Sequence, residues 1–249
     1  MTTPPSRVSM TDFSDGPIQT GKQSALGVRT ADVAALRADG SIVIGQRKVP
    51  TLPLFDAVFS AFARGTPFLT DTGMVAVEDL QPGDRVVTAD GHAERVTWIG
   101  SASFASQDAQ DRTILTRLMA DSFGVNRPDS FLSLGPAARL LQTPAHLRAD
   151  LGEKRVMTPA SVFVDGVNVI EVTPPTPVQM FHLSLERHAA VIAGGLEFET
   201  YHPGANPMRM LSHTLRSVFL SIFPHLSHIS EFGPMTYDRA PEENDLTAA

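Results

Sequence analysis

The chain has 249 residues, and 42% of them are hydrophobic, which is enough for one domain with a buried core and additional tails. Its formal net charge of −7 argues against a nucleic-acid-binding protein, because such a protein normally presents a basic face. The absence of cysteine excludes disulfides, thiolate metal sites and cysteine catalysis. The apolar runs are too short to span a bilayer and the first residues lack a signal-peptide core, so the compartment stays open between the cytoplasm and unconventional export.

The N-terminal region divides into two parts. Residues 1–25 are rich in Thr, Pro, Ser and Gly, a composition typical of disorder. Beyond them, apolar runs on both sides of an Asp39-Gly40 turn predict one hairpin at residues 27–50. We expect this flank to pack against an edge of the domain that follows.

The segment 61–100 has the densest strand and turn signals of the chain. Short apolar runs alternate there with three turns: Asp71-Thr72-Gly73, Gln81-Pro82-Gly83-Asp84 and Asp90-Gly91. Pro-Gly supplies the dihedrals of a type II turn, and Asp-Gly is a hairpin turn. The segment therefore predicts a four-strand β-meander. Further short apolar runs recur between residues 113 and 193, so we predict an all-β domain.

The periodicity changes from strand-like to helical after residue 205. Asn206 is a suitable N-cap, Pro207 fits the first helical position and Pro224 would end the helix. One helical face between them collects Met208, Leu211, Leu215, Val218, Phe219 and Ile222. We predict an amphipathic helix at 207–223 that docks on the β domain. The alternative, a membrane-surface or partner helix, is disfavoured by the presence of only two arginines.

These patterns divide the chain into four parts. We place the N-terminal flank at 1–50, the β domain at 51–204, the helical extension at 205–225 and a tail at 226–249. From residue 238 onward the tail is acidic, and we expect it to be disordered.

A set of motifs in this β domain is ordered in the same way as in a known family. They are Gly65-Thr66, Thr70 and Gly73, then Val77-Glu78-Asp79-Leu80-x-Pro82-Gly83-Asp84, and then Trp98-Ile99-Gly100. This order resembles the opening block of the Hint superfamily, which contains inteins and the autoprocessing domains of Hedgehog proteins. The resemblance covers about residues 55–203 and is strongest to a bacterial Hint-domain branch. It implies a Hint-type fold of short antiparallel strands.

The first signature residue of a Hint domain is a side-chain nucleophile that attacks the preceding carbonyl. The resemblance places this residue four positions before Gly65, at Ala61. The methyl side chain of alanine has no lone pair that could attack a carbonyl, so the acyl shift cannot start at this position. Ser60 is the neighbouring hydroxyl, although a slip of one residue along a strand turns the side chain to the other face. Ser60 is therefore kept only as a substitute nucleophile.

The second signature is a short Thr/Ser-Pro-x-His turn, whose histidine helps to protonate the scissile amide nitrogen. In one alignment Gly135 replaces the hydroxyl residue and Ala138 replaces the histidine, and the flanking strand and the following arginine both match. In the other, Thr143 and His146 form the turn themselves, but the flanking apolar runs are misplaced. We favour the first alignment, which makes His146 an exposed loop histidine.

The closing strands, at 178–201, resemble the last strands of the family. His188 matches a histidine often found there, and it is either a proton donor or acceptor or a hydrogen-bonded structural residue. No Asn for intein-type C-terminal cyclisation follows. We expect no cofactor and no metal site, because His182 and His188 lack helical ligand spacing and a carboxylate cluster.

These observations predict a degenerate Hint-domain protein that has lost autoprocessing and acts as a binding or structural module. Its partner would be an unidentified protein, with no nucleic acid and no transmembrane segment. The alternative is an active autoprocessing enzyme that uses Ser60 or another hydroxyl. A cargo or adhesion component of a larger assembly is a third hypothesis, and the sequence does not separate it from the first.

Overall fold

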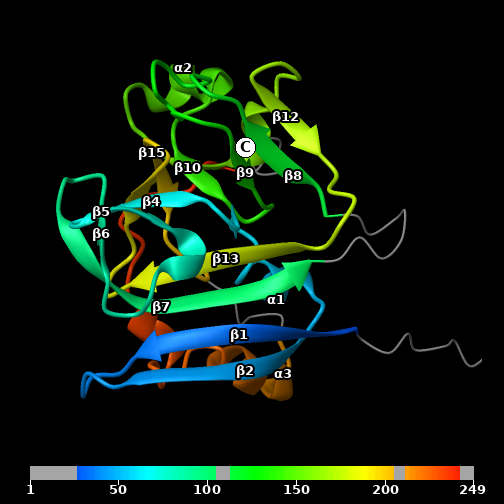
Figure 1. Cartoon of the computed structure of the whole chain (residues 1–249), viewed down its shortest axis with the longest axis vertical. Helices are drawn as coiled ribbons and strands as arrows, with labels where there is room; N and C mark the ends of the chain where they lie inside the picture. The colour runs from blue at the N-terminus through cyan, green and yellow to red at the C-terminus, as the bar shows by residue number, and fades with distance from the viewer. Residues whose placement is uncertain (1–26, 105–112, 205–210, 242–249) are drawn as a thin grey trace, which may run out of the picture.

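The computed structural model describes residues 27–104, 113–204 and 211–241, and in these residues fifteen strands join into one system of sheets (Figure 1). The strands pair antiparallel, which confirms the predicted all-β fold. The strands are β1 (Val28–Leu36), β2 (Ile42–Pro50), β3 (Phe62–Ala63), β4 (Pro67–Thr70), β5 (Gly73–Ala76), β6 (Arg85–Val87), β7 (Ala93–Phe104), β8 (Leu115–Leu118), β9 (Leu132–Leu134), β10 (Arg139–Leu141), β11 (Met157–Pro159), β12 (Val169–Val172), β13 (Val178–Leu185), β14 (Ala190–Ala193) and β15 (Leu196–Glu199). The α-helices are α1 (Pro53–Asp56), α2 (Arg148–Leu151) and α3 (His213–Ser221), and the 3₁₀ turns are η1 (Val77–Asp79), η2 (Ala145–Leu147), η3 (Ala160–Phe163) and η4 (Ile229–Phe232).

The four strands predicted for the segment 61–100 are present as β4 to β7, but their order in the sheet is β5-β4-β6-β7, so the predicted meander order is wrong. Strand β4 pairs with both β5 and β6, and β6 pairs with β7. Gly83 and Gly91 have φ angles of 105° and 82° in the connecting turns, which is the left-handed region that glycine tolerates best. A second detail also differs from the sequence prediction. Strand β5 ends at Ala76, and Val77 begins the 3₁₀ turn η1 with its buried side chain and an N–H that donates to the Thr66 carbonyl at 2.9 Å.

The predicted hairpin at 27–50 is also confirmed, as β1 and β2. The two strands pair from Val28↔Pro50 to Leu36↔Ile42 around the turn that contains Gly40, whose φ is 83°. Strand β1 then pairs with β7, from Ala31↔Ala102 to Ala35↔Trp98. The hairpin is therefore a continuation of the sheet, joined by backbone hydrogen bonds to β7, its longest strand.

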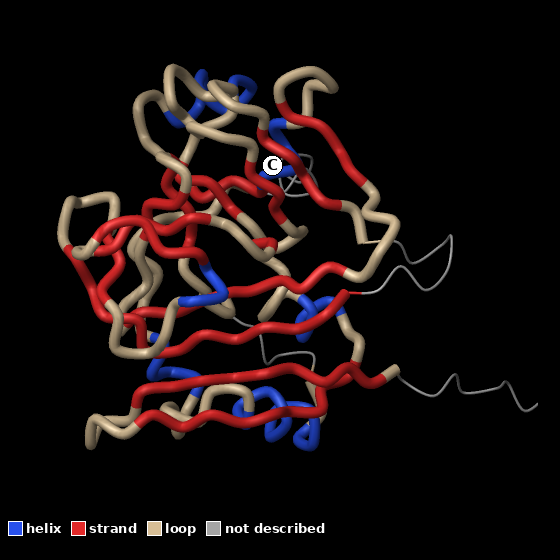
Figure 2. Tube along the Cα trace, in the orientation of Figure 1, coloured by secondary structure: helices blue, strands red, loops and turns tan. Residues whose placement is uncertain are grey.

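Helix α3 lies against the β1–β2 hairpin, whereas α2 lies at the opposite end of the molecule (Figures 1 and 2). Phe219 and Ile222 of the predicted apolar face are fully buried in an aromatic core with Trp98. The indole N–H of Trp98 donates to the Ile222 carbonyl at 2.8 Å, which satisfies one of the carbonyls left free at the end of the helix. No helix of the described residues is long and apolar enough to cross a membrane.

The boundaries of α3 are shorter than the predicted 207–223. Ser212 is the N-cap, because its hydroxyl accepts from the Leu215 N–H at 3.3 Å, and the helix ends at Ser221. The expected cap Asn206 and Pro207 lie outside the described residues.

The segment after the helix is packed on the domain, so the expectation of disorder from residue 238 is wrong up to residue 241. Phe232 of η4 packs edge-on against Tyr201 and Phe223. The Met157 N–H donates to the Asp238 carbonyl, and the Ala240 N–H donates to the Met157 carbonyl. Residues 242–249 lie outside the described part of the chain.

Candidate functional site

The peptide bond between Ser60 and Ala61 is buried and fully hydrogen-bonded. Ser60 is 3% exposed and Ala61 is not exposed at all. The Ala61 N–H donates to the Phe181 carbonyl at 3.2 Å, and the Ser60 carbonyl accepts from the Ala137 N–H at 3.0 Å. This bond is therefore held between strand β13 and the turn that precedes β10.

The turn Gly135–Ala138 is the one that the structure brings to Ala61. The Gly135 N–H donates to the Ala61 carbonyl at 2.8 Å, and Ala138 is buried. A Cβ added at Gly135 would lie 2.1 Å from the Ser60 carbonyl oxygen, far inside van der Waals contact. No residue with a side chain fits at position 135 on this backbone, so the turn has closed onto the peptide.

Thr143 and His146 occupy a different part of the molecule. The Thr143 hydroxyl donates to the Lys154 carbonyl at 2.5 Å, which fixes its proton away from the Ser60 peptide. His146 is exposed on η2, which leads directly into α2 at one end of the molecule (Figure 1). The local sequence of these residues resembles the family turn. In the structure, however, the Thr143 hydroxyl is bonded within the 143–154 loop and His146 is exposed on the same loop.

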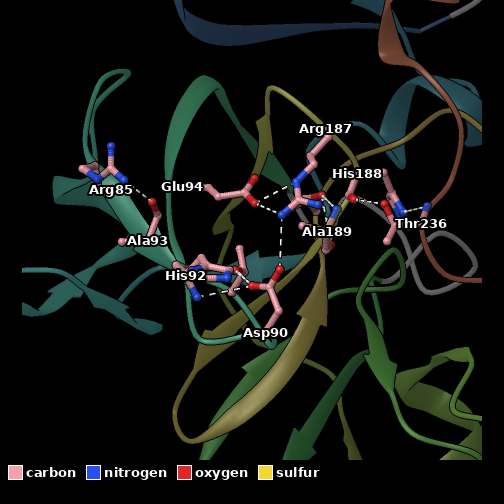
Figure 3. Close-up of polar contacts among 11 residues, drawn as sticks. Arg85, Asp90, His92, Ala93, Glu94, Arg187, His188, Ala189 and Thr236 are labelled. Carbon is pink, nitrogen blue, oxygen red and sulfur yellow. Dashed lines mark hydrogen bonds and ion pairs between the residues drawn. The ribbon is translucent and has the colours of Figure 1, made fainter.

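His188 is held by hydrogen bonds at both ring nitrogens. Its Nδ1 accepts from the Thr236 N–H at 3.0 Å, and its Nε2 lies 3.0 Å from Glu199 Oε1. Because Nδ1 is an acceptor, the proton of the neutral ring sits on Nε2 and is donated to Glu199. Figure 3 shows Thr236 beside His188. A histidine fixed in this way is a structural link between the β13–β14 turn and the C-terminal segment.

Glu199 is the centre of a buried ionic cluster that the sequence analysis did not identify. Arg239 Nε lies 2.9 Å from Oε1, and Arg139 lies 3.7 Å from Oε2. Burial alone raises the pKa of Glu199, but the hydrogen bond from His188 and the charges of both arginines outweigh it and lower the pKa to about 2. Glu199 is therefore a carboxylate, and its two oxygens are shared among three partners.

A cavity of about 140 Å³ opens beside this cluster. It is lined by Leu54, Ala57, Ala137, Arg139, His182, Glu199, Tyr201, His202, Pro203 and Arg239. Ala137 joins the cavity to the Ser60 peptide through its N–H. His202 is fully bonded, with Nε2 3.0 Å from the Gly233 carbonyl and Nδ1 accepting from the Gly204 N–H.

His182 and Tyr201 are the two remaining polar side chains of the cavity wall. Their rings meet edge to face, with centroids 5.3 Å apart. Burial lowers the pKa of His182 to about 3, so its ring is neutral at neutral pH. Burial also raises the pKa of Tyr201, so the phenol keeps its proton. Both side chains therefore present neutral polar groups.

The sequence model of the Hint domain family matches residues 60–205, which is more than half of the chain. The chain belongs to the Hint domain family. The match begins at Ser60 and ends six residues after Glu199, so it includes both the Ser60–Ala61 peptide and the buried ionic cluster. No curated protein matches the chain in sequence.

Solved structures of other Hint proteins resemble the chain at low identity. A bacterial intein-like domain from Clostridium thermocellum is 15% identical with a TM-score of 0.38, and the alignment covers 57% of this chain and 99% of that one. The Msm DnaB1 intein splicing domain is 19% identical with a TM-score of 0.31, covering 57% and 100% of the two chains. A DnaB intein from Synechocystis is 12% identical with a TM-score of 0.31, covering 57% and 99%.

The Hint domain also carries an exposed charged cluster on the far side of His188. Arg187 contacts Glu94 and lies 3.2 Å from Asp90, which ties the β13–β14 turn to β7 and to the turn before it (Figure 3). Pairs as exposed as these contribute little to stability. Among the described residues, no three of His, Asp or Glu are grouped in a way that could hold a metal ion.

Proposed function

We propose that the chain is a Hint domain that does not process itself and that acts as a binding or structural module. The observation that carries this proposal is the state of the Ser60–Ala61 peptide. It is buried, both of its polar atoms are hydrogen-bonded, and the residue that should attack it has only a methyl group. The turn opposite supplies Ala138 instead of an acid that could protonate the leaving nitrogen.

The alternative is an active domain in which Ser60 attacks the carbonyl of Phe59. One observation favours it, because the Ser60 hydroxyl makes no hydrogen bond with the described residues and is not committed elsewhere. Against it, a serine needs a base within about 3 Å to become a nucleophile, and His188 is bonded at both nitrogens. The non-processing interpretation therefore explains more of the geometry.

The experiment is to incubate the purified full chain and a Ser60→Ala variant with and without dithiothreitol and to follow their intact masses. We expect both proteins to stay intact, with the parent chain near 26.8 kDa. A break next to residue 60 in the parent chain that disappears in Ser60→Ala would establish the alternative instead.

A further inference from the structure

Strand β2 is an outer strand with an open edge. Among the described residues it pairs only with β1, and no strand lies beyond it (Figure 1). The ladder runs without a bulge from Ile42 to Pro50, and the single proline is the last residue of the strand. Proteins usually interrupt such an edge with bulges or internal prolines, because an open edge pairs readily with another strand. The edge of β2 is therefore a surface suited to pairing.

The ladder between β1 and β2 determines which backbone groups of β2 face outward. The Arg37 N–H donates to the Ser41 carbonyl and the Thr51 N–H donates to the Gly27 carbonyl, both at 2.8 Å. Bonded and non-bonded pairs alternate along an antiparallel ladder, so the odd-numbered residues of β2 are the ones that bond to β1. The backbone N–H and carbonyl groups that point away from β1 belong to Ile42, Ile44, Gln46 and Lys48.

The side chains of these four residues share the open face of the hairpin. Ile44 is 80% exposed and Ile42 is 45% exposed. The other face is covered, because Val49 is buried in the core that contains α3 and Arg47 Nε donates to the Ser221 carbonyl at 2.8 Å. The edge therefore presents two exposed isoleucines beside outward backbone groups.

We propose that β2 pairs antiparallel with β2 of a second copy of the chain, about a two-fold axis at Gly45. In this register Ile44 lies opposite Gln46 of the second copy, and Ile42 lies opposite Lys48. Each of the four outward N–H groups then meets a carbonyl across the axis. The two Ile44 side chains become diagonal neighbours on the open face, within reach of each other. The inference goes beyond the proposed function, and it concerns residues outside the matched range 60–205.

The charges at the two ends of β2 favour a second copy over an unrelated strand. Asp39 in the turn accepts from Ser41, and neither Asp39 nor Lys48 forms a salt bridge in the described part of the chain. The antiparallel register brings Lys48 of each copy beside the Asp39-Gly40 turn of the other. The two Lys48 residues are then six positions apart along the ladder, roughly 20 Å. Opposite charges are therefore close and like charges are separated.

The test is sedimentation velocity of the full chain across a range of concentrations. We expect a monomer–dimer equilibrium that rises from 26.8 kDa towards twice that mass. Ile44→Lys should weaken the dimer at least about tenfold, because it places two like charges as diagonal neighbours on an edge that lysine protects. The matched control is Val125→Lys, which changes an 86% exposed residue far from β2 in the sequence and should leave the dimer unchanged.

The absence of cysteine from the chain allows a single introduced thiol to report the axis. In the proposed register the two Gly45 residues form a non-hydrogen-bonded pair with Cα atoms about 4.5 Å apart, within the span of a disulfide. A Cβ at this position meets only the end of the Arg47 side chain. Oxidised glutathione should therefore link Gly45→Cys into a covalent dimer and leave Val125→Cys mostly monomeric.

A charge exchange tests whether the partner is another copy. Lys48→Glu should weaken the dimer on the order of two- to tenfold, because it faces Asp39 of the second copy with a like charge. Adding Asp39→Lys should restore the affinity, since both copies then carry the reversed pair. Restoration also controls for the lost hydrogen bonds between Asp39 and Ser41.

Three outcomes would overturn the inference: a parent chain that is monomeric at every concentration, an unchanged dimer in a folded Ile44→Lys protein, or a Gly45→Cys protein that links no better than Val125→Cys. Near-ultraviolet circular dichroism of Trp98, the single tryptophan, verifies that each variant folds. The intact mass of the same samples reports on the proposed function separately. An intact monomer refutes only the pairing of β2, whereas a cleaved chain refutes the non-processing assignment in any oligomeric state.

Discussion

The two sides of the candidate site differ in what they carry. One side, formed by Ser60–Ala61 and the Gly135–Ala138 turn, has small side chains and is held by backbone hydrogen bonds. The other side, formed by β13, the end of β15 and the C-terminal segment, carries a buried cluster around Glu199. Under the proposed function, reactive groups are missing from one side of the site while a buried polar network is kept on the other. On this proposal the network serves folding or binding, and its effect on stability can be measured separately from that of the small-residue side.

The largest effect should come from breaking the polar side of this comparison. Glu199→Gln leaves two arginines without a buried negative partner, so we expect a loss of about 3–5 kcal/mol in the free energy of unfolding at neutral pH. The matched control is Glu197→Gln on the same strand, where the carboxylate pairs with a half-exposed Arg155 and the loss should stay below about 1 kcal/mol. Urea unfolding measures both losses. Equal losses would show that the buried cluster around Glu199 contributes no more to stability than an exposed ion pair does.

A fall in pH should lower the free energy of unfolding through the same polar side of the site, which contains His182 and Glu199. His182 has a lowered pKa of about 3 and is neutral in the folded chain, whereas it gains a proton in the unfolded chain below about pH 6.5. The stability that the neutral His182 contributes is therefore fully present above pH 6.5, and it is lost as the pH falls towards the pKa of the folded state. Glu199, with a pKa of about 2, adds a further loss below about pH 4.5.

From His182 alone we expect a decrease of about 3 kcal/mol between pH 7 and pH 4, at about 1.4 kcal/mol per unit of pH, and the buried His225 adds to it. Urea unfolding midpoints across this range measure the decrease. His182→Gln should make the curve less steep between pH 6.5 and pH 4.5, and the slope that remains belongs to His202 and His225, whose pKa values burial also lowers. A parent curve that is flat from pH 7 to pH 4 would contradict the buried neutral state of His182.

Substitutions on the side formed by Ser60–Ala61 and the Gly135–Ala138 turn should change the free energy of unfolding less. There, added side-chain volume should matter and charge should not. Gly135→Ala places a methyl group 2.1 Å from the Ser60 carbonyl oxygen, so we expect a loss of about 1–3 kcal/mol as the backbone moves apart. In the control Gly45→Ala, the new methyl meets only the end of the Arg47 side chain at 3.1 Å, and unfolding should change by less than about 0.5 kcal/mol. A neutral Gly135→Ala would show that the turn is not closed onto the peptide in solution.

The smallest effect should come from the exposed cluster outside both sides. Arg187 is 56% exposed, and its contacts with Glu94 and Asp90 are screened by water. Arg187→Ala should therefore cost less than about 1 kcal/mol, and the difference should shrink further in 1 M salt. A loss as large as that of Glu199→Gln would mean that burial does not determine how much each ion pair of this domain contributes to the free energy of unfolding.

The sequence predicted the regular parts of the fold because their signals are local. Asp-Gly turns between apolar runs specify the β1–β2 hairpin and the turn between β6 and β7, and the apolar spacing after residue 210 gives the buried face of α3. The start of the helix was not predictable in the same way. The hydroxyl of Ser212 caps it, and a serine at that position does not stand out among the polar residues around it.

The polar side of the site was missed because its members come from four distant segments. Arg139, His182, Glu199 and Arg239 share no spacing that sequence periodicity could detect, and only the strand pairings bring them together. One signal was available, since Glu199 is a charged residue that closes an apolar strand next to Phe198. By contrast, Thr143 and His146 had the right local pattern, but the fold directs them to a different loop.

The central claim is that the chain does not cleave itself because its first signature position lacks a nucleophile, and the most direct measurement is the intact mass of three proteins incubated with thiol. We expect the parent chain and Ala61→Cys to remain essentially intact, since the leaving nitrogen still lacks an acid that contributes about 10²–10⁴-fold. Ala61→Cys combined with Ala138→His should release the segment before residue 61, provided that the Trp98 circular dichroism verifies its fold. Cleavage of the parent chain next to Ser60, or full cleavage of Ala61→Cys that depends on His146, would contradict the account.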